Sequence, residues 1–304
     1  MPVKEEQAAS TALKERQRPA VMSEYASSRP VRIVELSDGS PSEPPEGLWA
    51  RRELIGLMVK REFSGKYRGS LLGTLWPVIN PIGHLILYTF LFCVVLKVRL
   101  GNDGSMSNFA LYLMAGLLPW SCLSDSLSRS TTVILESPNL VKRAVFPLEI
   151  LPLVGVISAV LNELPALGIL FVATIIFFHQ VHVTALFLPL ILVSQVLFVS
   201  GLSWWLASLG VYIRDFRHVM TLALSAWMYA TPIVYPPTAL PANLQFMLWL
   251  NPMAGIVGDY RHVLLDGRPP DWKMYAVYTT VALVICLAGH RFFMNTKKSF
   301  ADVM

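Results

Sequence analysis

The sequence predicts an all-α protein that crosses a membrane several times. Of its 304 residues, 54% are hydrophobic and only 15% are charged, a composition too apolar for an ordinary soluble domain. Long apolar runs recur along the chain, and lysines and arginines gather at their ends. Because membrane topology explains this distribution, the net charge of +5 does not indicate a nucleic-acid partner.

Residues 1–47 differ from the rest of the chain. They are rich in charged residues, serine and proline and contain no apolar segment, so we expect a disordered cytoplasmic tail and no signal peptide. Residues 48–300 are expected to form the transmembrane domain.

Residues 48–67 are expected to form an amphipathic helix at the membrane surface. Apolar residues fall on two sides of this helix, which suits either a position between lipid and a protein partner or an anchor in the headgroup layer. The run that follows has no charge between Arg68 and Lys97. Six cations precede it and indicate its cytoplasmic end, namely Arg51, Arg52, Lys60, Arg61, Lys66 and Arg68.

Six apolar runs are long enough to cross a bilayer core of ~30 Å as helices, which places both termini in the cytoplasm. Pro77 and Pro81 should kink the first run. The third run is longer than one crossing needs and is interrupted by residues 162–165, Asn-Glu-Leu-Pro, so we expect either a tilted helix or a break there. The loop at residues 129–147 should be cytoplasmic. The six spans are expected at about residues 70–96, 109–127, 148–178, 185–212, 219–234 and 274–293.

Two shorter apolar pieces lie between the fifth and sixth runs, at residues 242–250 and 253–265, and Asn251 and Pro252 separate them. Each is too short to span the bilayer. We expect a pair of re-entrant helices on the external side, with their ends covered by protein or by a watery cavity.

No group of residues suggests catalysis. The histidines are scattered, and the pair His179 and His182 lacks a third ligand nearby, so we expect no metal site. The chain has no GxxxxGK[ST] motif, so a separate subunit must bind any ATP. Glu163 is a carboxylate inside an apolar run. It either faces a cavity or partner, or is a hydrogen-bonded or protonated group that stabilises a helix broken beside Pro165.

The aromatic residues Tyr88 and Phe92 lie one helical turn apart in the middle of the first run. An aromatic belt at the membrane surface does not explain a hydroxyl at that depth. Such rings could line a passage for sugars.

Five segments in order, KYRGSLLGTLWPVINP, NLVKRAVFPLEILP, RDFRHV, TPIVYP and LNP, resemble the membrane subunit of ABC exporters of lipid-linked polysaccharides such as O-antigen, capsule and wall teichoic acid. The resemblance covers residues 48–300. It implies a homodimer in the bacterial inner membrane, surrounded by lipid and paired with two ATPase subunits that bind ATP and Mg. The implied substrate is a polyprenyl-diphosphate-linked glycan, with O-antigen as the leading candidate.

The resemblance also implies roles for individual residues. The segment 137–147 would be a coupling helix against the ATPase, with Asn139, Leu140, Lys142, Arg143 and Phe146 as contacts. The first and fifth spans would line the channel, with Tyr88, Phe92, Trp227 and Tyr229 as its aromatic residues. The cations Arg61, Lys66 and Arg68 would guide the diphosphate, since such groups bind phosphate oxygens well. The preference for positive charge on the cytoplasmic side of a membrane explains these cations equally well.

Two alternatives remain at this stage. One is an integral membrane enzyme that acts on polyprenyl-linked sugars, with Glu163 or Asp125 as acid or base. The other is an ABC exporter of a small lipid or drug.

Overall fold

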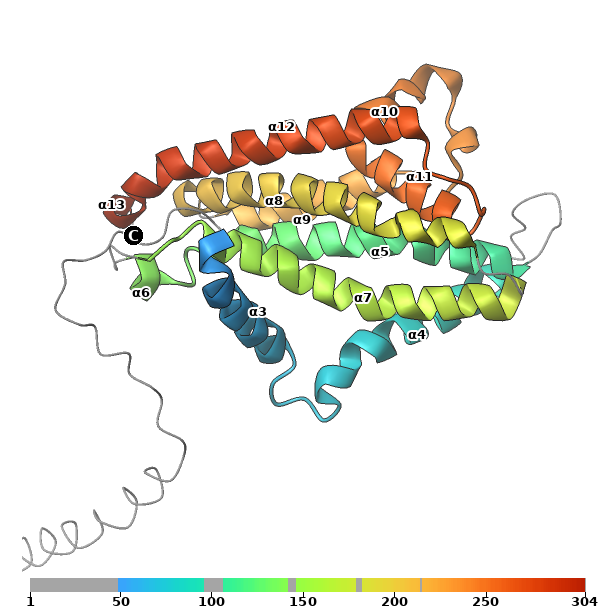
Figure 1. Ribbon diagram of the computed structural model, residues 1–304, viewed down its shortest axis with the longest axis horizontal. Helices are drawn as coiled ribbons and strands as arrows, with labels where there is room; N and C mark the ends of the chain where they lie inside the picture. The colour runs from blue at the N-terminus through green and yellow to red at the C-terminus, as the bar shows by residue number, and fades with distance from the viewer. Residues whose placement is uncertain (1–48, 96–105, 142–145, 179–181, 214, 304) are drawn as a thin grey trace, which may run out of the picture. The chain divides into compact units, whose positions relative to one another are not determined.

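The computed structural model describes residues 49–95, 106–141, 146–178, 182–213 and 215–303. The predicted tail, residues 1–47, lies outside these residues. The described part of the chain is helical and contains no strand among those residues, which confirms the predicted all-α class. Figure 1 shows the long helices running side by side, with the short α6 and α13 at one end and α10 and α11 at the other.

The first helices follow the predicted surface segment and first run. A short 3₁₀ turn, Trp49–Arg51, leads into α3, Arg52–Lys66, as expected for the surface helix. After a second 3₁₀ turn, Gly73–Leu75, comes α4, Trp76–Tyr88, and a π-helix continues it over Thr89–Val95. The helix thus begins later than residue 70, because Pro77 occupies its first turn, where the missing N–H costs nothing.

The remaining long helices match the predicted runs, with one exception. Helix α7 runs without interruption through residues 162–165, so of the two predicted alternatives the break is wrong. Proline removes only one backbone hydrogen bond, and a helix of 29 residues packed against its neighbours tolerates that loss. The bounds are α5 Met106–Ser130, α7 Ile150–Phe178, α8 Leu188–Tyr212 after the 3₁₀ turn Val183–Phe187, α9 Phe216–Ala230 and α12 Trp272–Thr296.

Within the described residues, three helices are long and apolar enough to cross a membrane, at Ile150–Phe177, Val183–Tyr212 and Trp272–Ser299, and Trp76–Phe92 is a shorter apolar helix. The polytopic membrane fold is therefore confirmed, and the count of six spans stays a prediction. Large apolar side chains are exposed on several helices, including Ile86 on α4, Leu222 on α9 and Val284 on α12. Such a surface suits lipid or another apolar partner.

The short elements also lie where the sequence places them. Helices α10, Phe246–Leu250, and α11, Pro252–Leu264, follow two 3₁₀ turns, Pro237–Ala239 and Ala242–Leu244. Asn251 separates α10 from α11 and caps α11 by accepting from the Met253 amide at 3.1 Å. The chain ends in the turn Lys297–Ser299 and α13, Phe300–Val303.

The side chain of Arg261 fixes α11 against the end of α9. It is 4% exposed and donates to the carbonyl oxygens of Pro232 at 2.6 Å and Ile233 at 2.7 Å, in the turn that follows α9. It also donates to the Tyr112 hydroxyl at 2.8 Å. These bonds satisfy carbonyls that a non-helical turn would otherwise leave without donors in an apolar interior.

Helices α8 and α12 approach each other closely at two glycines. A Cβ atom at Gly201 would lie 2.6 Å from the backbone nitrogen of Cys286, and one at Gly289 would lie 2.2 Å from the Gly201 carbonyl oxygen. Small residues of this kind allow membrane helices to pack backbone against backbone. The α8–α12 pair therefore depends on the absence of side chains at these positions.

We expect Gly201→Ala to destabilise the protein by about 1–3 kcal/mol through overpacking, and to lower its thermal unfolding temperature in detergent micelles. The matched control is Gly168→Ala on α7, where a Cβ meets nothing within 4 Å and the better helix propensity of alanine should keep or raise stability. Equal effects of the two substitutions would contradict the close approach.

Candidate functional site

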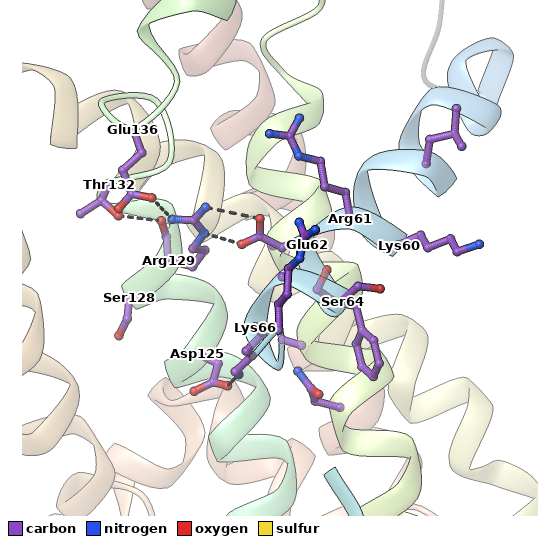
Figure 2. A pocket seen from close by; sticks show the side chains of 18 of the residues that line it. Lys60, Arg61, Glu62, Ser64, Lys66, Asp125, Ser128, Arg129, Thr132 and Glu136 are labelled. Carbon is purple, nitrogen blue, oxygen red and sulfur yellow. Dashed lines mark hydrogen bonds and ion pairs between the residues drawn. The ribbon is translucent and has the colours of Figure 1, made fainter. Parts of the chain in front are cut away.

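A charged cavity of about 1020 Å³ lies between α3, the end of α5 and α7 (Figure 2). Basic side chains come mainly from α3 and the turn after it, and acidic ones from α3 and from α5 with the turn that follows. The charged residues of its lining are Lys60, Arg61, Glu62, Lys66, Arg68, Asp125, Arg129, Glu136 and Arg217.

The three cations predicted to meet the diphosphate all line this cavity. Arg61 and Arg68 are exposed, and within the described ranges neither takes part in a salt bridge. Ser158 on α7 also lines the cavity, and its buried Oγ has no hydrogen-bond partner among the described residues. The cavity therefore offers donors that are not already committed to a protein acceptor.

Lys66 is the exception among the three cations. Its Nζ donates to Asp125 Oδ2 at 2.8 Å, and both side chains are about half exposed, at 50% and 54%. Partial burial by itself would lower the pKa of Lys66, but the hydrogen bond and the negative charge of Asp125 outweigh that effect and raise the pKa. Lys66 therefore stays charged at neutral pH and joins the end of α3 to α5.

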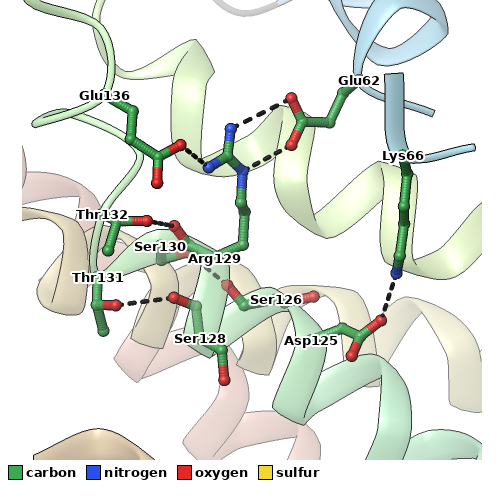
Figure 3. A network of polar contacts seen from close by, with 10 residues as sticks. All are labelled: Glu62, Lys66, Asp125, Ser126, Ser128, Arg129, Ser130, Thr131, Thr132 and Glu136. Carbon is green, nitrogen blue, oxygen red and sulfur yellow. Dashed lines mark hydrogen bonds and ion pairs between the residues drawn. The ribbon is translucent and has the colours of Figure 1, made fainter. Parts of the chain in front are cut away.

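Arg129 joins α3 to the start of the predicted coupling segment (Figure 3). It donates to both carboxylate oxygens of Glu62 on α3, at 2.6 and 3.4 Å, and forms a short ion pair with Glu136 in the turn after α5. Burial would raise the pKa of Glu136, yet the bonds from Arg129 and Thr132 hold it below its usual value. Sequence reasoning missed this arginine, because a basic residue at the end of a span looks like ordinary topology.

A second cavity, of about 380 Å³, adjoins the first and extends between α4, α5 and α7. Its lining mixes apolar side chains with polar ones, which include Asn80, His84 and Tyr88 of α4 and the carboxyl of Glu163. The two cavities share four lining residues, and these mark the junction between them: Lys66, Asp125, Ala159 and Asn162.

The four predicted channel aromatics do not gather in one place in the single chain. Tyr88 lines the second cavity, and Phe92 packs between Tyr88 and Phe109, with ring centroids 6.5 and 4.9 Å away. Trp227 packs edge-on against Trp120 and Phe198 and donates to Asn251 Oδ1 at 3.1 Å. Tyr229 is 65% exposed on the outside of α9.

The predicted coupling segment contains one short helix. Helix α6, Pro138–Val141, holds Asn139, which is exposed, and Leu140, which packs with Phe146 against a buried cluster at the ends of α8 and α12. The predicted contacts Lys142 and Arg143 lie outside the described residues. The base of the segment is thus anchored to the bundle.

The buried carboxyl of Glu163 belongs to a hydrogen-bonded ring that joins α7, α8 and α11. Gln195 Nε2 donates to Glu163 Oε2 at 2.9 Å, and the Tyr260 hydroxyl oxygen lies 2.7 Å from both Glu163 Oε1 and Gln195 Oε1. Glu163 and Gln195 are 4% and 0% exposed. Glu163 therefore has two protein partners, and it also lines the second cavity.

The ring has three contacts and therefore needs three protons. Tyr260 supplies one and the Gln195 amide supplies another, so the third must lie on Glu163. The count does not change if the nitrogen and oxygen of the Gln195 amide are exchanged. The amide nitrogen would then face Tyr260 and the amide oxygen would face Glu163, so the ring would still need a proton on Glu163. Glu163 is therefore neutral in this arrangement. This agrees with the interpretation of Glu163 as a hydrogen-bonded or protonated group, although the helix around it is not broken.

Comparisons with known proteins identify the family of the chain. A family model described as ABC-2 type transporter matches residues 53–265. The chain is 29% identical over 257 residues to the O-antigen export system permease protein RfbA of Myxococcus xanthus, covering 84% of this chain and 96% of that protein. It is 24% identical to RfbA of Klebsiella pneumoniae over 83% of this chain and 95% of that protein. It is 22% identical to the polysialic acid transport protein KpsM of Escherichia coli, over 81% and 95%.

We expect Glu163→Gln to keep the thermal unfolding temperature of the purified protein within a few degrees of wild type. The glutamine amide nitrogen can donate and its oxygen can accept, so the amide can replace the neutral carboxyl in the ring. Tyr260→Phe should destabilise by about 1–3 kcal/mol, because it leaves buried polar atoms without partners. A loss in Glu163→Gln as large as in Glu163→Leu would show that the ring contains a charged carboxylate.

Proposed function

We propose, from the premise that the chain belongs to the ABC-2 type transporter family, that it is the permease subunit of an ATP-driven polysaccharide exporter. Its substrate would be a polyprenyl-diphosphate-linked glycan, with O-antigen as the leading candidate, moved out of the cytoplasm across the bacterial inner membrane. The observation that carries this proposal is that relatives matched over 95–96% of their length are named for O-antigen export or polysialic acid transport.

ATP hydrolysis would come from a separate ABC ATPase, two copies of which would pair with a homodimer of this chain and hold ATP and Mg. Helix α6 supports this arrangement. It stands at the same end of the long helices as the carboxyl-terminal α13 (Figure 1), with Asn139 exposed. Together with Lys142, Arg143 and the anchored Leu140 and Phe146, it would dock on the ATPase in the cytoplasm, where both termini would also lie.

The first cavity would receive the diphosphate. A diphosphate needs several cationic donors close together, and Arg61, Lys66 and Arg68 line one cavity. Guanidinium groups bind phosphate oxygens through paired hydrogen bonds. Topology would explain cations at the membrane surface, but it does not require them to surround a cavity.

The glycan would follow the α4 side of the protein. Tyr88 lines the second cavity, and Phe92 supports it from the next turn. Tyr229 is exposed on α9 and would face the passage or the second copy of the chain in a homodimer. Trp227 is held by Trp120, Phe198 and Asn251, so its role would be to position α9 and α11.

The enzyme alternative gains no support from the two carboxylates it requires. Glu163 is held in a hydrogen-bonded ring, and Asp125 is paired with Lys66. The alternative of a small lipid or drug as substrate would leave the large charged cavity without an explanation.

We expect Arg68→Ala to reduce glycan export in cells at least about tenfold, since one charge-assisted contact to phosphate contributes roughly 1.5–3 kcal/mol. Assembly with the ATPase should persist in co-purification. The control is Arg52→Ala, an exposed arginine on α3 outside the cavity, which should export normally. Normal export by Arg68→Ala would remove the headgroup assignment, and a wild-type protein that supports no glycan export would refute the proposed function.

We expect the double substitution Lys142→Glu with Arg143→Glu to uncouple ATP hydrolysis from export, because it reverses the charge that would face the rim of the ATPase groove. The measurement is ATPase activity and export in the same membranes. Lys298→Glu, a charge reversal at an exposed lysine in the carboxyl-terminal turn, should leave coupling unchanged. Coupling that survives the double substitution would count against this docking site.

A further inference from the structure

We propose that the carboxyl end of α3 is a gate between the two cavities, and that the diphosphate of the lipid-linked substrate opens it by replacing Asp125 as the partner of Lys66. This inference rests on the proposed function and adds how the substrate passes from the first cavity into the second. The gate would let the second cavity open only after an anionic headgroup has occupied the first.

The position of the gate follows from the lining of the two cavities. Lys66 and Asp125 line both of them, together with Ala159 and Asn162 of α7. The ion pair therefore stands where the two cavities meet, and Figure 3 shows Lys66 pointing to Asp125 on α5. A ligand moving directly from the first cavity to the second would pass this ion pair.

Two polar contacts from adjacent residues hold the end of α3 across this junction. Lys66 reaches Asp125 on α5 at 2.8 Å, and the Tyr67 hydroxyl donates to Asn162 Oδ1 on α7 at 2.8 Å. The backbone then passes through Gly69 at φ +83° and Gly73 at φ +48°, where a Cβ atom would meet nothing within 4 Å. Left-handed glycines in open space can absorb the torsional change of a hinge.

The ion pair has the strength expected of a contact that a ligand can replace. A half-exposed lysine–carboxylate pair contributes little to stability because water competes for both groups. A diphosphate carries more charge than one carboxylate and could be held at once by Arg61 and Arg68, which share the cavity with Lys66. Lys66 would therefore exchange partners when the headgroup arrives.

A second ion pair keeps the rest of α3 in place during this exchange. Arg129 contacts both carboxylate oxygens of Glu62 as well as Glu136, so removing it requires two acidic partners to be replaced. Glu62 lies one helical turn before Lys66 on α3. Motion would thus be confined to the last turn of α3 and the glycine segment after it.

Two serines on α5 provide matched reporters. Ser121 lines only the second cavity and Ser128 only the first, and both are exposed. Each is changed to cysteine in a chain whose three native cysteines, Cys93, Cys122 and Cys286, are replaced by alanine. The assembled transporter in inside-out vesicles is then labelled from its cytoplasmic side with a cationic, membrane-impermeant methanethiosulfonate.

With the gate intact, Ser128→Cys should react readily from the cytoplasmic side. Ser121→Cys should react more slowly, because its exposed side chain lies in the second cavity, beyond the Lys66–Asp125 pair. Adding Asp125→Asn or Tyr67→Phe should speed labelling at Ser121→Cys by about fivefold, the range that loss of one exposed polar contact allows, and leave Ser128→Cys unchanged. Asp125→Asn also removes a negative charge that would attract the reagent, so a faster rate cannot arise from electrostatic attraction. Unchanged labelling in both variants, with export intact, would overturn the gate and leave the proposed function standing.

The exchange of partners has its own test in purified full-length protein in nanodiscs. Affinity for geranylgeranyl diphosphate should rise about fivefold in Asp125→Asn, which removes the competing carboxylate, and fall in Lys66→Met. A merely structural ion pair would weaken binding in both variants, which would overturn the exchange. Inorganic pyrophosphate should bind more weakly than the prenyl diphosphate, and equal affinities would assign the site to a free anion and overturn the lipid headgroup as its ligand.

Discussion

The need to satisfy polar groups inside an apolar bundle governs how the helices of this protein are held together. A buried donor or acceptor without a partner is costly where water is absent, and the ring of Glu163, Gln195 and Tyr260 answers this need by joining α7, α8 and α11. Arg261 does the same for the turn after α9. The short α11 is therefore held in place by polar side chains whose hydrogen-bond partners lie on other helices and in the turn after α9.

At the opposite end of the bundle, some charged side chains form ion pairs between segments and others face a cavity. Glu149 accepts from Arg51 and Lys297 and joins the turn before α3 to the carboxyl-terminal turn, while Arg129 joins α3 to the segment before α6. Arg61 and Arg68, by contrast, face a cavity. Some charged groups of α3 thus fix its position through ion pairs, and others line the cavity.

Sequence patterns alone predicted much of this architecture correctly. Apolar runs located the long helices and the two short helices beside Asn251, because lipid requires each crossing segment to satisfy its own backbone. The prediction failed at residues 162–165, where asparagine, glutamate and proline indicated a break. Asn162 and Glu163 instead find partners in Tyr67, Gln195 and Tyr260, so the polar residues that signalled an interruption stabilise a continuous helix.

The sequence by itself determined the membrane class, the helical elements and the gathering of cations before α4, since these depend on local composition and periodicity. Only the tertiary structure decided which cations are free, that Lys66 meets Asp125 from 59 residues away, and that two cavities meet beside them. Such pairings depend on contacts between helices remote in the chain. The sequence shows that a charged side chain is present. Which group it pairs with depends on the helix packing that brings a second charged residue close to it.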